Sequence, residues 1–404
     1  MSEETTQVQL HGMAHGGEAV GRLEDGRAVF VTGGIPGETV EIRITREKKR
    51  WARADLVSVI EASSDRVEPP CPFVGDCGGC QWQHISLERQ RALKREIILG
   101  QLQHLAGLEE PPVEATVGVG EADGFGYRNH VHLSVDHAGM TGYYRAGTRE
   151  VVPVDSCRLL HPLLREWQEQ LPPLPGAKRL ELRAGTRTFQ RLALLRGYVD
   201  EDAGEESYQR GIPLGRAGEG EITEMVGTER FRISSKSFFQ VNTDGAEKLV
   251  ELVLEMLELD EETSVVDAFA GVGLFTLPMA RVARKVWAVE RHPAAVRDLR
   301  FHANDFKDRI HIVGTDMQDA FTQLPGTADR VLADPPREGL GDDIAKGLLE
   351  MKPQKIVLVA CDPASLARDA KSLIDGGYTL QRVAPVDLFP HTYHIEAVAE
   401  FIRT

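Results

Sequence analysis

The chain has 404 residues, of which 42% are hydrophobic and 27% are charged, and its net charge is −15. This composition is typical of a globular protein with two or three domains. No apolar run approaches the ~20 residues of a membrane span, and the first residues lack a signal-peptide pattern, so we expect a cytoplasmic protein without a membrane partner. The acidic balance argues only weakly against a nucleic-acid partner, because phosphate binding depends on local positive charge.

Residues 5–62 predict a small β-domain. Glycine-rich turns separate short apolar segments, which are 8–10, 28–31, 39–44 and 54–60. This pattern is typical of a partly open five-stranded barrel, a fold that often binds oligonucleotides. Segment 43–53 adds six basic residues around Trp51, and such residues hold phosphates while an aromatic ring stacks on a base. The alternatives are a solvated hairpin face and a purely structural β-domain.

Three of the five cysteines lie close together in a glycine-containing loop. Cys71, Cys77 and Cys80 are separated by five and two residues. An odd number of cysteines in a cytosolic chain favours metal binding or catalysis over disulfides. A fourth ligand is needed, and Cys157 is the remaining candidate besides Cys361. Zinc is an alternative, but three-plus-one spacing resembles iron–sulfur ligation more than the two close pairs of a zinc site. Unrelated reduced thiols are the other alternative.

The middle of the chain predicts a helix and a second β region. Leucine and isoleucine recur on one side of residues 84–107, which indicates an amphipathic helix. The predicted strands of a mixed β region are 127–134 and 179–183. Arg128 and Arg145 are candidate contacts to phosphates or bases, although either can be an ordinary surface charge. Residues 200–221, rich in acids and glycine, predict an exposed loop or hairpin.

The last third alternates between strand and helix patterns. A helix is expected to begin near Thr243, and another to follow the glycine turn at 271–273. The expected strand segments are 264–269, 285–290, 310–316, 330–337, 355–361 and a final strand after residue 396. This alternation predicts an α/β fold with a parallel, doubly wound sheet.

Cys361 lies at the end of the sheet where active sites of α/β proteins are found. It ends an apolar, mostly β-branched strand, and Asp362 and Pro363 are a good N-cap and first residue for the following helix. Ligands bind at the carboxyl ends of strands in open α/β sheets, and a helix N-terminus favours thiolate over thiol. The alternative is a buried cysteine that acts as a small hydrophobic residue.

The first two strand ends predict a nucleoside cofactor. The turn at 271–273 follows Asp267 but lacks the three-glycine dinucleotide fingerprint. Glu290 ends the next strand, where an acid can accept hydrogen bonds from ribose hydroxyls. A nucleoside cofactor without a pyrophosphate fits both observations. The alternative is a glycine that only lets helix pack on strand.

Two more acids belong to the same region. Asp334 ends the fourth strand, and the two prolines after it fix the loop beside the Cys361 strand. Glu396 precedes the final strand. His391 and His394 could be ligands, but histidines three apart in a loop are more often part of a hydrogen-bonded structure.

Five ordered motifs resemble those of the bacterial RNA uracil-5-methyltransferases. They span 238–242, 267–273, 334–337, 360–368 and 389–396. The N-terminal unit is similar to a TRAM domain, and the cysteines resemble those of the cluster-bearing 23S rRNA branch. On this basis we expect three domains. They are a TRAM-like RNA-binding barrel (1–63), a central domain with a cluster loop (64–235), whose helix 84–107 packs on the catalytic domain, and a Rossmann-like methyltransferase domain (236–404).

The resemblance implies catalytic roles that the chemistry needs. Uracil C5 becomes nucleophilic once a thiolate has added at C6, and Cys361 is the implied nucleophile. Glu396 is the implied base that removes the C5 proton. Asp334 is implied to contact the pyrimidine edge or the cofactor, with Arg337 supporting it.

The resemblance also implies two cofactors. The positions that match S-adenosylmethionine contacts are Gln240, Phe269, Glu290, Asp316 and Asp334. The positions that match ligands of a structural [4Fe–4S] cluster are Cys71, Cys77, Cys80 and Cys157. Leu274 replaces the Asn that the family commonly has after Gly-x-Gly, so a contact to the methionine end of the cofactor is in doubt there, and Leu274 is not assigned to the site.

The expected function is therefore S-adenosylmethionine-dependent formation of 5-methyluridine in 23S rRNA by a monomeric enzyme. The same chemistry on tRNA is the alternative substrate. A non-catalytic iron–sulfur RNA-binding protein is the rival of a different class. A redox enzyme is disfavoured, because no flavin or nicotinamide fingerprint is present. The target uridine must leave its stack to reach Cys361.

Overall fold

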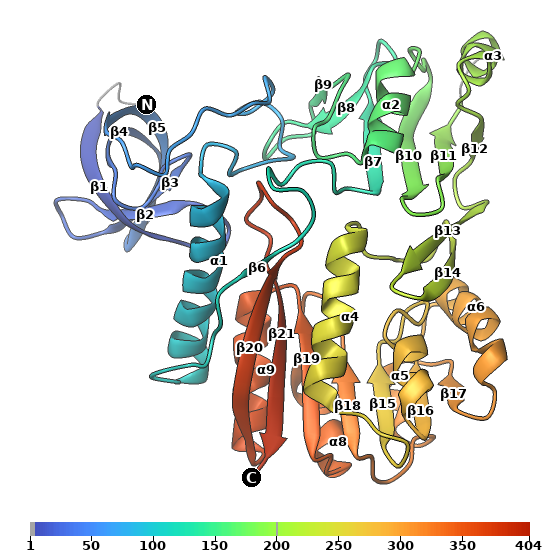
Figure 1. Cartoon of the computed structure of the whole chain (residues 1–404). Coiled ribbons are helices and arrows are strands. Elements are labelled where there is room, and N and C mark those ends of the chain that lie inside the picture. The colour runs from blue at the N-terminus through green and yellow to red at the C-terminus, as the bar shows by residue number, and fades with distance from the viewer. Residues whose placement is uncertain (1–4, 199–200) are drawn as a thin grey trace.

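The structure is a computed structural model that describes residues 5–198 and 201–404. Figure 1 shows an N-terminal barrel and a central β-domain lying above a large α/β sheet. The chain ends at the lower edge of that sheet, where its last strand terminates. The parallel strands run the other way, so their carboxyl ends point toward the barrel and the central domain.

The barrel is closed, in the strand order β1-β2-β3-β5-β4. Its strands are β1 (Thr6–Met13), β2 (Ala19–Arg22), β3 (Ala28–Thr32), β4 (Thr39–Glu47) and β5 (Trp51–Glu61). The predicted barrel was partly open, and that detail is wrong. The long β5 pairs with β4 along one edge and with β3 along the other, while β1 pairs with both β2 and β4, so no strand is left with a free edge.

The central domain holds a six-stranded mixed sheet in the order β12-β11-β10-β7-β8-β9. Its strands are β7 (His130–Val135), β8 (Thr141–Tyr144), β9 (Val151–Pro153), β10 (Ala177–Gly185), β11 (Gln190–Gly197) and β12 (Leu214–Arg216). Helix α2 (Pro162–Gln170) covers one face through Leu164 and Trp167. A hairpin of β13 (Glu221–Val226) and β14 (Glu229–Ser234) leads on to the catalytic domain.

The prediction of a loop or hairpin over 200–221 is partly wrong. Residue 200 lies outside the described residues, and the segment after it forms helix α3 (Glu201–Gln209) before β12. Ala203 and Ser207 are the buried residues of α3. These two residues are four positions apart, so they lie on the same face of the helix. The helix was not predicted because the acidic composition of the segment suggested a loop.

The catalytic domain contains an eight-stranded sheet in the order β17-β16-β15-β18-β19-β21-β20-β6. Its strands are β15 (Ser264–Ala268), β16 (Lys285–Val289), β17 (Ile310–Val313), β18 (Arg330–Ala333), β19 (Lys355–Ala360), β20 (Tyr378–Asp387), β21 (Glu396–Arg403) and β6 (Val117–Gly118). The five strands from β17 to β19 are parallel, as predicted, but β21 runs antiparallel to both neighbours. The sequence analysis missed β20.

Helices cover both faces of this sheet, as a doubly wound fold requires. Apolar residues of α4, α5 and α6 fill one core, and those of α1, α7, α8 and α9 fill the other. The helices on the first face are α4 (Thr243–Leu257), α5 (Thr276–Val282) and α6 (Pro293–His302), followed by the 3₁₀ turn η2 (Ala303–Phe306). Those on the second are α1 (Leu87–Gln101), α7 (Met317–Ala320), α8 (Gly341–Glu350) and α9 (Pro363–Asp375).

Helix α1 belongs to the central segment of the chain but packs against the catalytic sheet. Ile97, Ile98 and Leu102 are buried in the same core as α9. A π-helical turn, η1 (Leu102–Ala106), extends α1, and Gly107 ends it in the left-handed conformation at φ 72°. Within the described part of the chain, no helix is long and apolar enough to cross a membrane.

Candidate active site

Cys361 lies between the end of β19 and the start of α9. The predicted cap is confirmed, since Asp362 Oδ1 accepts a hydrogen bond from Ser365 N at 2.8 Å and Pro363 is the first helical residue. The second oxygen, Asp362 Oδ2, lies 3.2 Å from His15 Nε2 in the barrel. The barrel thus reaches the residue next to Cys361. Sequence reasoning missed His15, because nothing in a local pattern reports a contact between distant segments.

Glu396 lies beside Cys361 because of strand pairing. Ala397 pairs with Ala360 in the antiparallel β19–β21 ladder, so the residues just beyond each end of the ladder are neighbours. Glu396 is only 3% exposed. Burial raises its pKa well above the usual value, the charge of Asp334 adds to this, and Arg337 opposes it.

Cys361 and Asp334 share this environment. Burial raises the pKa of the Cys361 thiol to about 12, with further contributions from Glu396 and Asp334, while Arg337 lowers it. Burial also raises the pKa of Asp334 to about 7. The expected thiolate-favouring effect of the α9 N-terminus is thus outweighed by burial and two acids. The site concentrates three acidic groups with one guanidinium, a combination that is common where proton transfers occur.

The glycine turn after β15 and the acid after β16 are in contact. Glu290 Oε2 accepts from Gly271 N at 2.9 Å, and Oε1 accepts from His292 N at 2.6 Å. Phe269 adopts φ 68°, which is uncommon for a residue with a side chain. At Gly273 a Cβ would lie 2.8 Å from Leu299 Cδ1, so a glycine is needed for close helix packing. These contacts fix the carboxylate and the turn against each other.

Asp267 is a further acid in this region. It is fully buried, accepts a hydrogen bond from Thr276 Oγ1, and its Oδ1 has no partner in the described structure. Burial raises its pKa to about 7, and the charges of Asp334 and Glu290 act in the same direction. A buried carboxyl with an orphaned oxygen beside a glycine turn marks a place where a polar ligand can be received.

The other predicted cofactor residues differ in how far they are buried. Asp316 is exposed and caps α7, with its Oδ1 accepting from Asp319 N at 3.0 Å. Gln240 is buried just before α4, and its backbone oxygen accepts from Asn129 Nδ2 at 3.2 Å. Leu274, which was not assigned to the site, is buried.

The strand order arranges the candidate residues along one edge of the sheet. Read across neighbouring strands from β17 through β16, β15 and β18 to β19, the residues that follow the strand ends are Asp316, Glu290, Phe269, Asp334 and Cys361. An extended ligand lying across this edge would meet the first residues at one end and the nucleophile candidate at the other.

The structure brings the four candidate metal-ligating cysteines together. Burial raises the pKa of Cys80 to about 12, and the thiols of Cys157, Cys77 and Cys71 add to this rise, which requires them to be near. The loop curls closely, because a Cβ on Gly78 would lie 2.8 Å from Tyr144 O.

Four thiols, three from one loop and one from a neighbouring segment, match the ligand number of either a tetrahedral zinc site or a [4Fe–4S] cluster.

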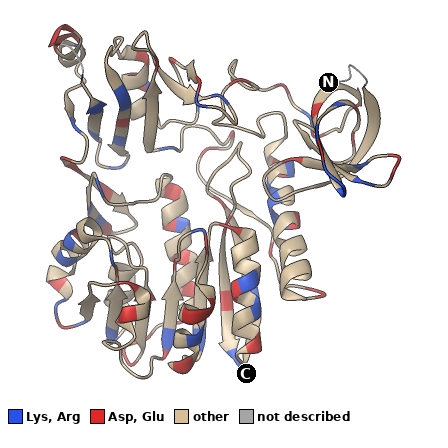
Figure 2. Cartoon of the chain, turned by 180° about the vertical axis from the view of Figure 1, so that it is seen from behind, with Lys and Arg blue, Asp and Glu red and all other residues tan. Residues whose placement is uncertain are grey.

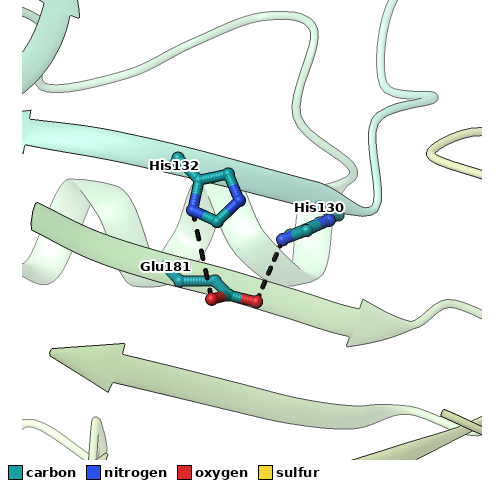
Figure 3. A group of neighbouring side chains, drawn as sticks. All are labelled: His130, His132 and Glu181. Atoms are coloured by element: carbon teal, nitrogen blue, oxygen red, sulfur yellow. Dashed lines mark hydrogen bonds and ion pairs between the residues drawn. The ribbon is translucent and has the colours of Figure 1, made fainter. Parts of the chain in front are cut away.

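A second group of possible ligands lies on the central sheet. His132 stands opposite Glu181 in the β7–β10 register, and His130 lies 3.1 Å from Glu181 Oε1 (Figure 3). The buried Arg183 also approaches, with its Nε 2.9 Å from the same oxygen. A metal ion would compete with this guanidinium for the single carboxylate. We therefore interpret the group as an ion-pair network, not as a metal centre.

Basic and acidic residues are spread over the molecule (Figure 2). On the β4–β5 hairpin, the guanidinium carbons of Arg46 and Arg53 both lie 5.7 Å from the Trp51 ring centre. Lys48, which joins the two strands, is exposed. Arg53 also pairs with Glu18 at 3.1 Å, and Arg145 pairs with both Asp76 and Glu150.

Comparison with known proteins gives consistent family assignments. The family described as tRNA (Uracil-5-)-methyltransferase matches residues 225–403, and the TRAM domain matches residues 3–57. An uncharacterized RNA methyltransferase of Gloeobacter violaceus is 36% identical over 99% of this chain and 97% of its own. One from Streptomyces avermitilis is 34% identical over 98% of both chains.

A solved structure supports the fold. The tRNA (uracil-54, C5)-methyltransferase of Pyrococcus abyssi, in complex with S-adenosyl-L-homocysteine, superposes with a TM-score of 0.74. It is 23% identical and covers 98% of this chain and 100% of its own. The predicted methyltransferase fold and TRAM barrel are thereby confirmed. The matches along the whole chain show that it belongs to the RNA uracil-5-methyltransferase family and is an S-adenosylmethionine-dependent enzyme.

Proposed function

We propose that this enzyme methylates C5 of a uridine in 23S rRNA through a covalent bond between Cys361 and C6 of the uracil. The observation that carries the proposal is the β19–β21 pairing, which sets Glu396 beside Cys361 with Asp334 close by. Uracil C5 is a poor nucleophile until a thiolate adds at C6, and the added thiol can leave only after a base removes the C5 proton. One cysteine and one carboxylate at the same ring meet both requirements.

The bonds balance in four steps. Cys361 first loses its thiol proton to water, the resulting thiolate Sγ bonds to C6, and the electrons of the C5–C6 double bond form an enolate. C5 then takes the methyl group from the sulfonium and leaves S-adenosylhomocysteine. Glu396 removes the C5 proton, and the Sγ–C6 bond breaks as the ring double bond returns. Burial gives the Glu396 carboxylate a high proton affinity, and Arg337 favours the charged form of both groups.

In this proposal S-adenosylmethionine lies across the carboxyl edge of the parallel strands. Glu290, held by two backbone N–H groups, keeps lone pairs for the ribose hydroxyls. Phe269 and Asp316 line the nucleoside end, Gln240 borders the site from the start of α4, and Asp334 stands between cofactor and uracil. When bound, the cofactor supplies the electrophilic methyl group.

The barrel (1–63) would bind RNA, the central domain (64–235) would carry the cysteine site, and the catalytic domain (236–404) would hold the cofactor. Trp51 with its flanking arginines suits an unpaired base and its phosphates. We expect the enzyme to act on RNA as a monomer in the cytoplasm. A tRNA is the second candidate substrate, because the matched family and the Pyrococcus relative are both named for tRNA.

Methyl transfer separates the two substrates. Labelled S-adenosylmethionine is incubated with unmodified 23S rRNA and tRNA transcripts separately, and the nucleosides are analysed. We expect label in 5-methyluridine from the rRNA transcript. Label in the tRNA transcript alone would overturn the substrate proposal but keep the reaction, and no label in either, from enzyme that binds the cofactor, would overturn both.

We also propose a structural [4Fe–4S] cluster on Cys71, Cys77, Cys80 and Cys157. Their proximity and their number support it. Protein purified without oxygen should contain iron and sulfide with a broad visible absorption band. Cys157→Ser should lose iron, and the matched control Cys361→Ser should keep it. Equal iron in both variants would contradict this ligand set.

A further inference from the structure

The cysteine loop (residues 71–80) is attached to the segment that leads to Glu396. Directly after Cys80, two successive backbone N–H groups donate to one oxygen. Gln81 N lies 3.1 Å and Trp82 N 3.0 Å from His391 O. The peptide of His391 is therefore the point at which the cysteine loop meets the catalytic segment.

His391 is held from several sides. Its backbone N donates to Gln90 Oε1 at 2.8 Å, and its Nε2 lies 2.9 Å from the carbonyl oxygen of Asp123. Since a carbonyl only accepts, Nε2 carries the proton. Nδ1 lies 3.3 Å from Gln90 Nε2, whose N–H groups also donate to Trp82 O and Ile85 O. The ring also stacks on Phe125 with centroids 4.0 Å apart. The backbone N–H, the backbone oxygen and Nε2 of His391 are thus all hydrogen-bonded.

The backbone at this point is unusual. His391 has φ 66°, in the left-handed region that residues with side chains seldom occupy. Such a conformation persists only when surrounding contacts determine it. The contacts come from α1, from the segment after the cysteine loop and from the loop before β7, so the fold specifies this one residue closely.

The segment on either side of His391 is anchored to the catalytic domain and to α1. Asn242 Nδ2, at the cap of α4, donates to Leu388 O at 3.0 Å. Lys94 Nζ, from α1, donates to Phe389 O at 3.0 Å and to Asp387 Oδ1 at 2.6 Å. The segment is therefore fixed before and at His391. Five residues later comes Glu396, whose position depends on this anchor.

We propose that His391 is a positioning residue that joins the cysteine loop to the catalytic segment, so that order in the loop sets the place of Glu396 relative to Cys361. The inference rests on the proposed role of Glu396 as the base. A displaced base slows the removal of the C5 proton more than the earlier steps. The enzyme would then accumulate as a covalent, methylated RNA adduct.

The test measures this adduct on a denaturing gel, with label on the S-adenosylmethionine methyl group and the transcript that the wild-type enzyme methylates. His391→Asn keeps the left-handed backbone, because Asn tolerates positive φ, but loses the ring contacts. His391→Val adds a β-branched side chain that this φ disfavours. Since a misplacement of ~1 Å can cost 10²-fold, we expect about threefold more adduct in His391→Asn and at least about tenfold more in His391→Val.

Two controls separate the possible failures. Glu396→Gln should accumulate adduct most strongly, and its failure to do so would refute the proposed function itself. His137→Asn, at an exposed turn, should behave as wild type. Iron content and S-adenosylmethionine affinity should stay unchanged in both His391 variants.

The outcomes are decisive even if His391→Val does not fold. A folded His391→Asn that is slower without any rise in adduct, or that shows wild-type adduct, overturns the inference. Loss of iron from His391→Asn would also overturn it, since His391 would then build the cysteine site without positioning the base.

Discussion

Two buried glutamates in this chain have pKa values that are shifted in opposite directions. Glu38, at the end of the barrel, is fully buried and receives hydrogen bonds from Arg66, Ile35 N and Ser63 N. Burial alone would raise its pKa, but these donors hold the pKa below its usual value. Glu396 is equally enclosed, but burial and the charge of Asp334 raise its pKa well above the usual value.

The difference separates structural acids from reactive ones. A paired acid is ionised and stabilises the fold, whereas an acid buried near like charges costs folding energy and retains proton affinity. Asp267, Asp334 and Glu396 all have raised pKa values, and all lie at the carboxyl edge of the catalytic sheet. Asp369 of α9 is also buried with a raised pKa but accepts a hydrogen bond from Leu340 N, so it is the grouping of three such acids at one edge of the sheet that coincides with the proposed reaction site.

The largest expected effect concerns the reaction site. Cys361→Ala should lower methyl transfer by at least about 10³-fold, because no other route makes uracil C5 nucleophilic. Equilibrium binding of S-adenosylmethionine should be unchanged, since the cofactor residues follow other strands. Substantial turnover in this variant would contradict the assignment of the nucleophile.

The second prediction compares the two glutamates directly. Glu38→Gln leaves Arg66 without a counter-charge and should lower the free energy of unfolding by ~2–4 kcal/mol. Glu396→Gln removes an unpaired buried acid and should leave stability unchanged or higher while abolishing turnover. Urea unfolding at neutral pH measures the free energy of unfolding of both variants. A large stability loss in Glu396→Gln would contradict the distinction between a structural and a reactive glutamate.

The third prediction uses pH. The pKa of Asp334 is raised to about 7 in the folded chain, so the folded state holds this proton more tightly than the unfolded state. Ionisation of Asp334 therefore lowers stability as pH rises from about 4 to about 7, the opposite of a paired acid such as Glu38. Asp334→Asn should remove this loss, and its gain in unfolding free energy should be larger at pH 8 than at pH 5. An equal gain at both values would contradict the raised pKa.

The smallest effect concerns the contact between barrel and catalytic loop. His15→Ala removes the partner of Asp362, and a partly exposed ion pair contributes less than ~1 kcal/mol. We expect at most about a fivefold rise in the KM for RNA with unchanged folding. His11→Ala, an exposed histidine on β1 just before the turn that holds His15, is the matched control. A larger effect from His11 would show that the barrel contact does not matter.

Local patterns predicted much of this architecture. The five parallel strands, the Asp362 cap, Gly107 as the end of the α1 helical segment and the TRAM barrel are each encoded within a few residues. The closed barrel, the antiparallel β21 and the strand β20 were not predicted, because they depend on which distant segments pair.

The candidate active site was likewise predicted only in part. The positions of Cys361, Glu290 and Asp334 at strand ends followed from hydrophobic runs that stop at polar residues. The raised pKa of Cys361 could not be predicted, because it depends on burial and on two acids from other strands. The contacts of His15 with Asp362 and of His391 with the residues after Cys80 were not predicted for the same reason, since each joins segments that are far apart in the sequence.

The most direct test of the account is to trap the covalent intermediate. Glu396→Gln is incubated with the substrate transcript and labelled S-adenosylmethionine, digested, and the modified peptide identified by mass spectrometry. The account predicts a methylated uridine attached at Cys361. A modification at another residue, or catalysis without any adduct, would contradict it.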